Sequence, residues 1–243
     1  MLTKNVVFLA AATFISGSAL AETAKPSADA HAQHGHAAPS GDQMVQVRAI
    51  LKNIVDDNDK FVRMHKQAYF EPFIKKQSPR ATVVTCADSR VHSQALDATP
   101  DGDLFFVRNI GNQLATTEGS IEYGVEHLNT PVLLFIGHVS CGAIQAATGD
   151  YAMLSAPIKR ELDTLKIKKG GDLLENVRLN VNNQVSDALR KFASRVDAKQ
   201  LVVVGAVYDF ADALHHGYGR LEITNINGET DPAKIKRTGL IKL

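Results

Sequence analysis

The sequence of 243 residues contains no tryptophan, only two cysteines and 6% aromatic residues. So few aromatic side chains argue against a surface that stacks nucleic-acid bases. Charge is also nearly balanced, because 27 basic and 26 acidic side chains leave a formal net charge of +1. Without a basic excess we expect neither a nucleic-acid nor an acidic-membrane partner. At 44% hydrophobic residues, the chain is long enough to bury the core of one sizeable domain.

The N-terminus carries the features of a secretory signal peptide. Lys4 supplies a short positive region, residues 6–15 are apolar but too few to span a bilayer, and residues 19–21 read Ala-Leu-Ala. We therefore expect a signal peptide over residues 1–21, cleaved after Ala21, and a periplasmic or secreted mature chain. An uncleaved anchor or a buried helix is the alternative. No later apolar run is long enough for stable membrane insertion.

Residues 22–42 are rich in alanine, serine, proline and glycine and contain no large apolar side chain. Such a composition cannot offset the entropy lost on ordering, so we expect a flexible linker. The segment contains three histidines, His31, His34 and His36, and a tract of this kind can bind zinc. We favour the interpretation that they are solvated linker residues.

The remaining chain, residues 43–243, is predicted to form one α/β domain. Apolar residues recur at three- and four-residue steps from Met44, which predicts a helical arm that ends near Pro72 and packs on a neighbour such as another subunit. Near-continuous apolar runs predict buried strands at 81–86, 104–108, 132–137 and 201–207. Helices are predicted at 117–128, 141–148 and 172–192. This alternation predicts a mostly parallel central β-sheet flanked by helices, with functional groups at the carboxyl ends of strands.

The two cysteines follow two of these apolar runs. Cys86 ends the first, and Cys141 comes three residues after His138 at the end of the other. Thiolate, imidazole and thiolate suit Zn²⁺ in tetrahedral geometry. We therefore predict one zinc ion per subunit, held by these three residues with a fourth position open for catalysis. The competing interpretation for an exported chain is a structural disulfide between Cys86 and Cys141.

Asp88 and Arg90 follow the first cysteine at two-residue steps. A carboxylate at this place can orient a hydroxide and accept its proton, but an unrestrained carboxylate can also occupy the metal. The Arg90 guanidinium offers a bidentate fork that would hold Asp88 off the zinc. We assign both residues catalytic roles, in preference to a surface ion pair.

The motifs CADSR at 86–90 and HVSCG at 138–142 strongly resemble those of the β-class carbonic anhydrases. The resemblance extends from Gln77 to Asp209 and includes GDLFFVRNIGN, SIEYGVEHL and VVGAVYD. It implies a zinc enzyme of α/β fold that reversibly hydrates CO2 to bicarbonate and a proton, through attack of a zinc-bound hydroxide. It also implies homodimers or larger homo-oligomers whose active sites lie at the subunit interface.

Further site residues follow from the resemblance alone. Gln77 matches the glutamine whose amide binds bicarbonate or CO2, and Gly142 matches the glycine whose backbone N–H faces the substrate. The apolar pocket walls are matched by Phe105, Ile110 and Tyr123. His127 resembles the proton-shuttling histidine of some plant-like members, and it lies four residues after Tyr123, on the same helix face. A plain helix-surface histidine is the alternative for this position.

Departures from the family pattern bear on the subtype. Members with a bicarbonate-gated site tend to have Trp three residues before the first cysteine and Gly directly before it, where this chain has Val83 and Thr85. This difference favours the always-open site, with water rather than a carboxylate as fourth ligand. Residues 210–220 are longer than the usual tight hairpin, and we interpret His215 and His216 there as exposed loop residues rather than a second metal site.

Three other functions stay open from the sequence. A disulfide-bonded protein would need no zinc, and a non-catalytic zinc-binding module would not depend on Asp88. A hydrolase of CS2 or COS could use a similar site, because access to the pocket decides which substrate enters it.

Overall fold

The structure is a computed structural model that describes residues 43–241. The predicted signal peptide (1–21) and the predicted linker with its three histidines (22–42) lie outside the described residues. The chain divides into two compact units after Lys66. Among the described residues, no helix is long and apolar enough to cross a membrane.

The first unit contains α1 (Gln43–Met64), an amphipathic helix of 22 residues without a buried residue. Its large apolar side chains are exposed, as at Leu51 and Ile54. The second unit begins with α2 (Gln67–Phe70) and the 3₁₀ helix η3 (Glu71–Phe73). The predicted helical arm is therefore confirmed as helical, in three pieces rather than one.

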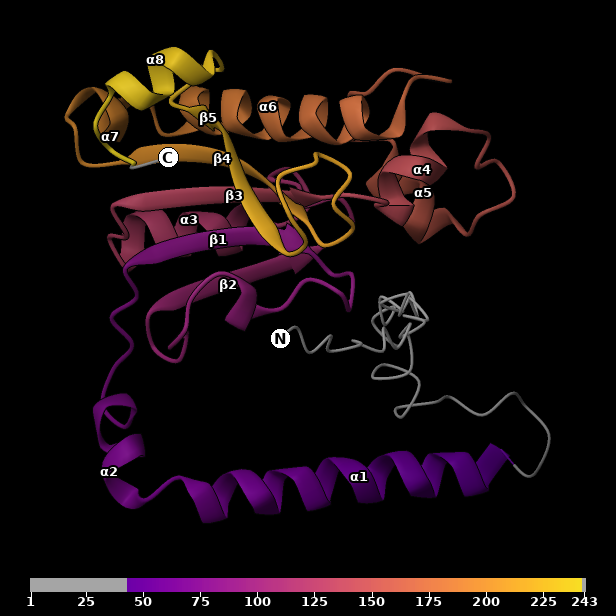
Figure 1. The fold of residues 1–243 in the computed structure, drawn as a ribbon, viewed down its shortest axis with the longest axis vertical. Helices are drawn as coiled ribbons and strands as arrows, with labels where there is room; N and C mark the ends of the chain where they lie inside the picture. Colours follow the sequence, from indigo (N-terminus) through magenta and orange to yellow (C-terminus); the bar gives the residue numbers. More distant parts are fainter. Residues whose placement is uncertain (1–42, 242–243) are drawn as a thin grey trace, which may run out of the picture. The chain divides into compact units, whose positions relative to one another are not determined.

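The second unit is built on a sheet of five strands in the order β2-β1-β3-β4-β5 (Figure 1). The strands are β1 (Ala81–Cys86), β2 (Leu104–Asn109), β3 (Val132–His138), β4 (Val202–Asp209) and β5 (Arg220–Ile226). The first four run parallel, and β5 is antiparallel to β4. The four predicted strands are confirmed, and β5 is an edge strand that the sequence analysis missed.

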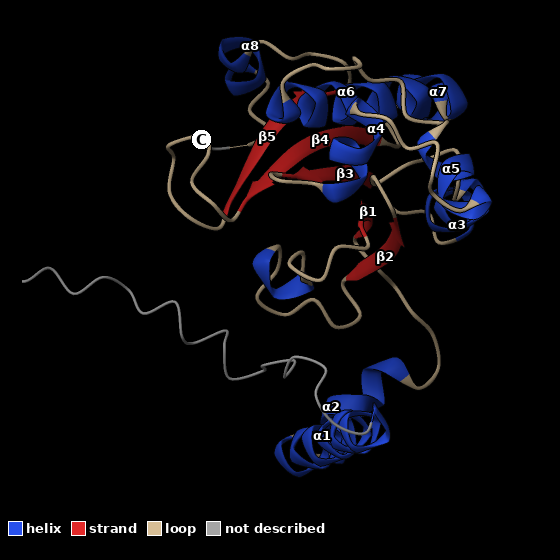
Figure 2. Cartoon of the chain, turned by 90° about the vertical axis from the view of Figure 1, so that its right-hand side faces the viewer, coloured by secondary structure: helices blue, strands red, loops and turns tan. Residues whose placement is uncertain are grey.

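The helices of the second unit flank this sheet (Figure 2). They are η4 (Ser93–Ala95), α3 (Glu118–Glu122), α4 (Gly142–Thr148), α5 (Ala156–Leu162), α6 (Leu173–Lys191), α7 (Ala193–Asp197) and α8 (Pro232–Arg237). The α3 helix continues into a π-helical turn, η5 (Tyr123–His127). The predicted fold class, a mostly parallel central sheet flanked by helices, is confirmed.

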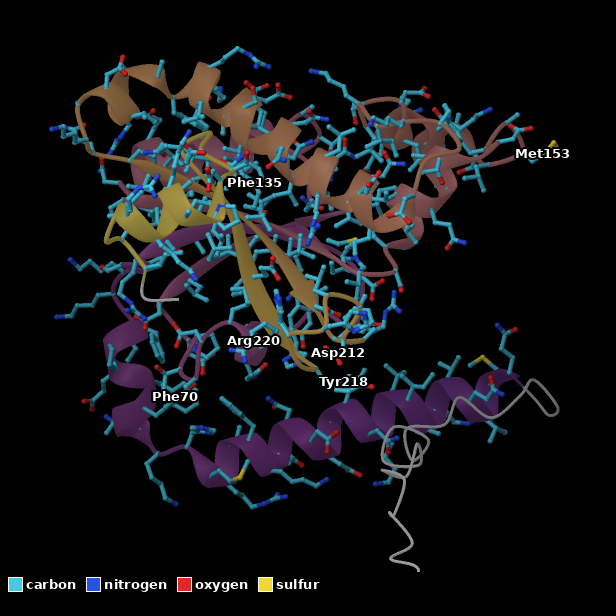
Figure 3. All side chains as sticks on the ribbon, turned by 45° about the horizontal axis from the view of Figure 1, so that its top comes forward. Phe70, Phe135, Met153, Asp212, Tyr218 and Arg220 are labelled. Atoms are coloured by element: carbon cyan, nitrogen blue, oxygen red, sulfur yellow. The ribbon has the colours of Figure 1, made fainter. Side chains whose placement is uncertain are left out.

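The long helix α6 packs along β3 and β4. Its start is defined by Asp172, whose side chain accepts a hydrogen bond from the Glu175 backbone N–H. Glycines in the strands permit the close approach, because a Cβ at Gly137 would lie 2.8 Å from the Val181 side chain. The largest side chain of the core beneath α6, Phe135, is fully buried (Figure 3).

Candidate metal centre

The carboxyl ends of two neighbouring strands bring Cys86 and His138 together. Cys86 is the last residue of β1 and His138 the last of β3, and the register pairs Thr85 with Ile136. After β3 the chain turns back through Ser140, whose φ of +53° lies in the left-handed region. This turn returns Cys141 to the same place, directly before the first residue of α4.

The three side chains form a compact group. The two sulfurs are 4.0 Å apart, and the donor atoms of Cys86, His138 and Cys141 all lie within 4.8 Å of one another. Both cysteines are free and buried. A disulfide requires an S–S distance of about 2.05 Å, so the structure has two thiols here rather than the alternative disulfide.

The histidine is prepared to donate a lone pair. Its Nδ1 lies 3.0 Å from the Val139 carbonyl oxygen, and since a carbonyl only accepts, Nδ1 carries the proton. The Nε2 atom then has a free lone pair, and it is buried without a hydrogen-bond partner. An orphaned imidazole nitrogen beside two thiols is the donor set that zinc prefers, so the residues present fit the predicted metal.

The two thiols do not ionise alike. A hydrogen bond from the Cys141 thiol lowers the pKa of Cys86, and this effect exceeds the opposing effect of burial. The backbone N–H of Gly111 contributes in the same direction as Cys141. The same hydrogen bond raises the pKa of Cys141, which must lose its proton only when a metal compensates the second charge.

Asp88 lies beside this group and is held by Arg90 on both oxygens. Arg90 Nε donates to Asp88 Oδ1 at 2.9 Å, and Nη2 donates to Oδ2 at 2.8 Å. The Arg90 backbone N–H adds a bond to Oδ1, and Nη2 also reaches the Ser140 carbonyl oxygen at 3.1 Å. These bonds, with the Arg90 side chain foremost, lower the pKa of Asp88 to about 2. The carboxylate is therefore charged at neutral pH.

Two of the predicted substrate residues lie at this same end of the sheet. Ile110 is half-buried and packs against the apolar cluster that includes Cys86 and Cys141. Gly142 opens α4 directly after Cys141, and a Cβ at this glycine would meet no atom within 4 Å. The surface at Gly142, next to Cys141, is therefore open.

The other predicted site residues lie at the opposite end of the sheet. Phe105 pairs with Thr82, four residues before Cys86, which is about 13 Å along a strand. The Tyr123 ring lies 5.9 Å from Phe105 and stacks on His127 at 4.6 Å between centroids. The predicted shared face of Tyr123 and His127 is confirmed.

Gln77 belongs to this amino end as well. It is exposed, comes before β1, and lines a cavity of about 470 Å³ with Phe73 and Asp101. One chain alone therefore does not place Gln77, Phe105 or His127 next to its own Cys86.

The sequence analysis missed a supporting network behind the metal group. Asn180 of α6 donates to the Gly111 carbonyl oxygen at 2.8 Å, and the side chain of Gln184 accepts from the Leu114 backbone N–H at 2.8 Å. These bonds hold the loop whose Gly111 backbone N–H contacts Cys86. A signal exists, because Asn176, Asn180 and Gln184 recur at four-residue steps on the buried face of α6.

Two histidines occupy the loop after β4. His215 and His216 are exposed, as predicted, and His216 Nδ1 pairs with Glu222 at 2.8 Å. Within residues 43–241, the group of potential metal ligands found is the one formed by Cys86, His138 and Cys141.

Comparisons with known proteins agree with this geometry. The family model for carbonic anhydrase matches residues 81–215. Carbonic anhydrase 2 of Mycobacterium tuberculosis is 44% identical over 72 residues, which cover 29% of this chain and 35% of that protein. The chloroplastic β carbonic anhydrase 5 of Arabidopsis thaliana is 35% identical over 108 residues, covering 39% of this chain and 36% of that protein. The chain thus spans about a third of the length of these relatives.

The fold is shared with solved β-carbonic anhydrases. A tetrameric enzyme from Sordaria macrospora superimposes with a TM-score of 0.59 at 23% identity, over 72% of this chain and 96% of that one. The residues that the family model matches, 81–215, include both strand ends that carry the metal group and the loops beside them. This chain therefore belongs to the carbonic anhydrase family, in its β class.

Proposed function

We propose that this protein is a zinc-dependent carbonic anhydrase that interconverts CO2 and bicarbonate. The observation that carries the proposal is the buried donor set of Cys86, His138 and Cys141 with an arginine-held Asp88 beside it. Zinc held by these three residues would act as a Lewis acid that makes a water molecule nucleophilic near neutral pH.

Asp88 would orient the nucleophile from one particular oxygen. Its Oδ1 accepts two hydrogen bonds from Arg90, whereas Oδ2 accepts one and keeps a lone pair free. Oδ2 is also the oxygen that faces the metal group, 3.8 Å from His138 Nε2. Because the carboxylate is charged at neutral pH, Asp88 accepts a hydrogen bond there, and Arg90 keeps it from binding the metal itself.

Positioning of CO2 falls to the apolar side of the same space. The half-buried Ile110 would offer an apolar wall, and the lack of a side chain at the exposed Gly142 would leave the approach of CO2 unobstructed there. Holding CO2 there converts a bimolecular encounter into a reaction between oriented neighbours.

We also propose that the working form is a homodimer or larger homo-oligomer. The substrate-binding Gln77, the pocket residues Phe105 and Tyr123, and the proton-shuttling His127 would then act on the metal group of a second copy. This is supported by the place of Phe105, which pairs with Thr82, four residues or about 13 Å along the strand before Cys86, and by the 43% exposure of Tyr123.

The proposal also includes a subtype, the always-open site, and a location outside the cytoplasm. An always-open site agrees with Val83 and Thr85 in β1 and with an Asp88 that Arg90 holds on both oxygens. Export to the periplasm or the medium rests on the signal-peptide features of residues 1–21.

Stopped-flow CO2 hydration with zinc quantified in the same sample tests the proposal. Asp88→Asn should lower kcat/KM by about 10²- to 10⁴-fold while zinc stays bound. The matched control is Asp187→Asn, which removes a carboxylate paired with Arg190 on α6, far in sequence from the metal group. Equal activity of Asp88→Asn and wild type would contradict the proposal, as would hydrolysis of CS2 or COS without hydration of CO2.

A further inference from the structure

The Arg90 guanidinium is restrained in its plane and also on one face. In its plane it donates to both oxygens of Asp88 and to the Ser140 carbonyl oxygen. Across the plane, its Cζ lies 4.6 Å from the centroid of the Phe210 ring. A cation over an aromatic face at this distance is attracted to it. Of these four contacts of Arg90, the one with the Phe210 ring is therefore the one that opposes tilting of the guanidinium out of its plane.

Phe210 itself is held in place by its neighbours. It follows Asp209, the last residue of β4, whose fully buried carboxylate accepts backbone N–H bonds from Ala211, Ala213 and Leu214. The Gly219 N–H closes the loop by donating to the Asp209 carbonyl oxygen at 2.7 Å. Figure 3 shows the loop, with Asp212 and Tyr218 labelled on it.

The same ring also reaches the metal group. Its centroid lies 6.1 Å from that of the His138 imidazole, and 5.9 Å from that of Tyr208 in an edge-on arrangement. Phe210 thus lies between the end of β4 and the two side chains, Arg90 and His138, that flank Asp88. A ring so placed couples the loop after β4 to the orientation of Asp88.

We propose that Phe210 is a positioning residue: its ring fixes the plane of the Arg90 guanidinium and, through it, the direction of Asp88 Oδ2. This inference rests on the proposed carbonic anhydrase function. It assigns a role to the long loop after β4, which sequence analysis treats only as an extended hairpin.

The test compares Phe210→Leu, which keeps an apolar side chain but removes the aromatic face, with Phe210→Tyr, which keeps both. In the zinc-loaded protein, Phe210→Leu should lower kcat by about 3- to 30-fold with zinc content unchanged. Phe210→Tyr should stay within about twofold of wild type. The matched control is Phe106→Leu, since Arg108 lies over the Phe106 ring at 5.4 Å, outside the metal group. It should leave kcat unchanged.

A second readout separates positioning from packing. In an Arg90→Lys background, Phe210→Leu should add little further loss, because the planar group that the ring restrains is gone. An equal loss in both backgrounds, or equal losses from Phe210→Leu and Phe210→Tyr, would overturn the proposal. If Phe210→Leu does not fold, Phe210→Met fills the same space flexibly and is judged by the same outcomes.

The visible spectrum of the Co²⁺-substituted protein provides a readout without turnover. Phe210→Leu should shift the cobalt bands, because a less restrained Asp88 approaches the metal, and Phe106→Leu should not. An unchanged spectrum would overturn the positioning role. Should wild type show no CO2 hydration at all, the proposed function fails, and the cobalt spectra still decide whether Phe210 controls Asp88.

Discussion

The two ends of the central sheet differ in how much of a functional site a single chain assembles there. At the carboxyl end, Cys86, His138 and Cys141 are buried and gathered within 4.8 Å. At the amino end, Gln77 and His127 are exposed and belong to no such group in residues 43–241. One chain thus gathers the three candidate metal ligands by itself, while Gln77 and His127 are presented outward at the other end of the sheet.

Removal of a metal donor should have the largest effect and should be confined to the carboxyl end. His138→Ala takes away the orphaned Nε2, so zinc affinity should fall by more than about 100-fold and zinc per chain should approach zero by elemental analysis. The control is His215→Ala, an exposed histidine on the loop after β4. Full zinc content in His138→Ala would refute the assigned donor set.

Mixing two inactive variants tests whether the two ends work together across subunits. Gln77→Ala damages only the amino end and Asp88→Asn only the carboxyl end. If sites form between copies, random dimers made by joint refolding should regain about a quarter of wild-type activity, because a quarter of the sites unite two intact ends.

The matched control mixes Asp88→Asn with His138→Ala, two lesions at the same end, and should regain nothing. No recovery from the first mixture, with mixed dimers shown to be present, would mean that each chain works alone. Recovery from both mixtures would contradict the assignment of Asp88 and His138 to one and the same end.

The network behind the metal group should have an intermediate effect. Asn180→Leu frees the Gly111 carbonyl oxygen from α6, so zinc affinity should fall by about 10-fold, measured by competition with a metal indicator. The control is Asn183→Leu on the same helix, whose side chain bonds the Lys166 carbonyl oxygen instead. Equal affinities of the two variants would show that the network supports the fold alone.

The smallest effect is a dependence of stability on pH at the carboxyl end of β4. Burial raises the pKa of Asp209, but the backbone N–H groups of Leu214, Ala213 and Ala211 outweigh it and leave the pKa lowered. A carboxyl group with a lowered folded-state pKa stabilises the protein above its unfolded pKa of about 3.9 and loses this contribution as pH falls further.

Urea unfolding of the EDTA-treated protein between about pH 5 and pH 3 should therefore show a shallower pH slope for Asp209→Asn than for wild type. EDTA removes the separate pH dependence of metal binding. Identical slopes would mean that Asp209 titrates alike in the folded and unfolded chain.

Much of the carboxyl end could be predicted because its signals are local. A β-branched apolar run ends at Cys86, another ends at His138, and parallel strands must place both ends at one edge. The pairing of Asp88 with Arg90 also follows from a two-residue spacing. Such features depend on few residues and on backbone geometry that the sequence controls directly.

The separation of the two ends is harder to predict from motifs alone. Phe105 and Ile110 occur five residues apart in one motif, yet β2 carries Phe105 near its start and Ile110 lies just past its end. The closeness of Phe105 and Ile110 in the motif gives no sign of this distance. The distance follows only once the two residues are placed along an extended strand. The Phe210 contact with Arg90 depends on tertiary pairing, for which the loop after β4 carries no periodic signal. The missed strand β5 does carry one, because polar and apolar residues alternate from Arg220 to Thr224.

The left-handed backbone of Ser140 has a consequence for the spacing of His138 and Cys141. In coordination-chemistry terms, His138 and Cys141 would together form a bidentate ligand. Its bite, the separation of the two donor atoms, depends on the main chain at Ser140, where φ is +53°. Replacing Ser140 by glycine would keep that conformation accessible at lower conformational cost in the folded state but widen the range of bites available. The distance between these two donor atoms thus depends on a backbone dihedral angle as well as on the side chains.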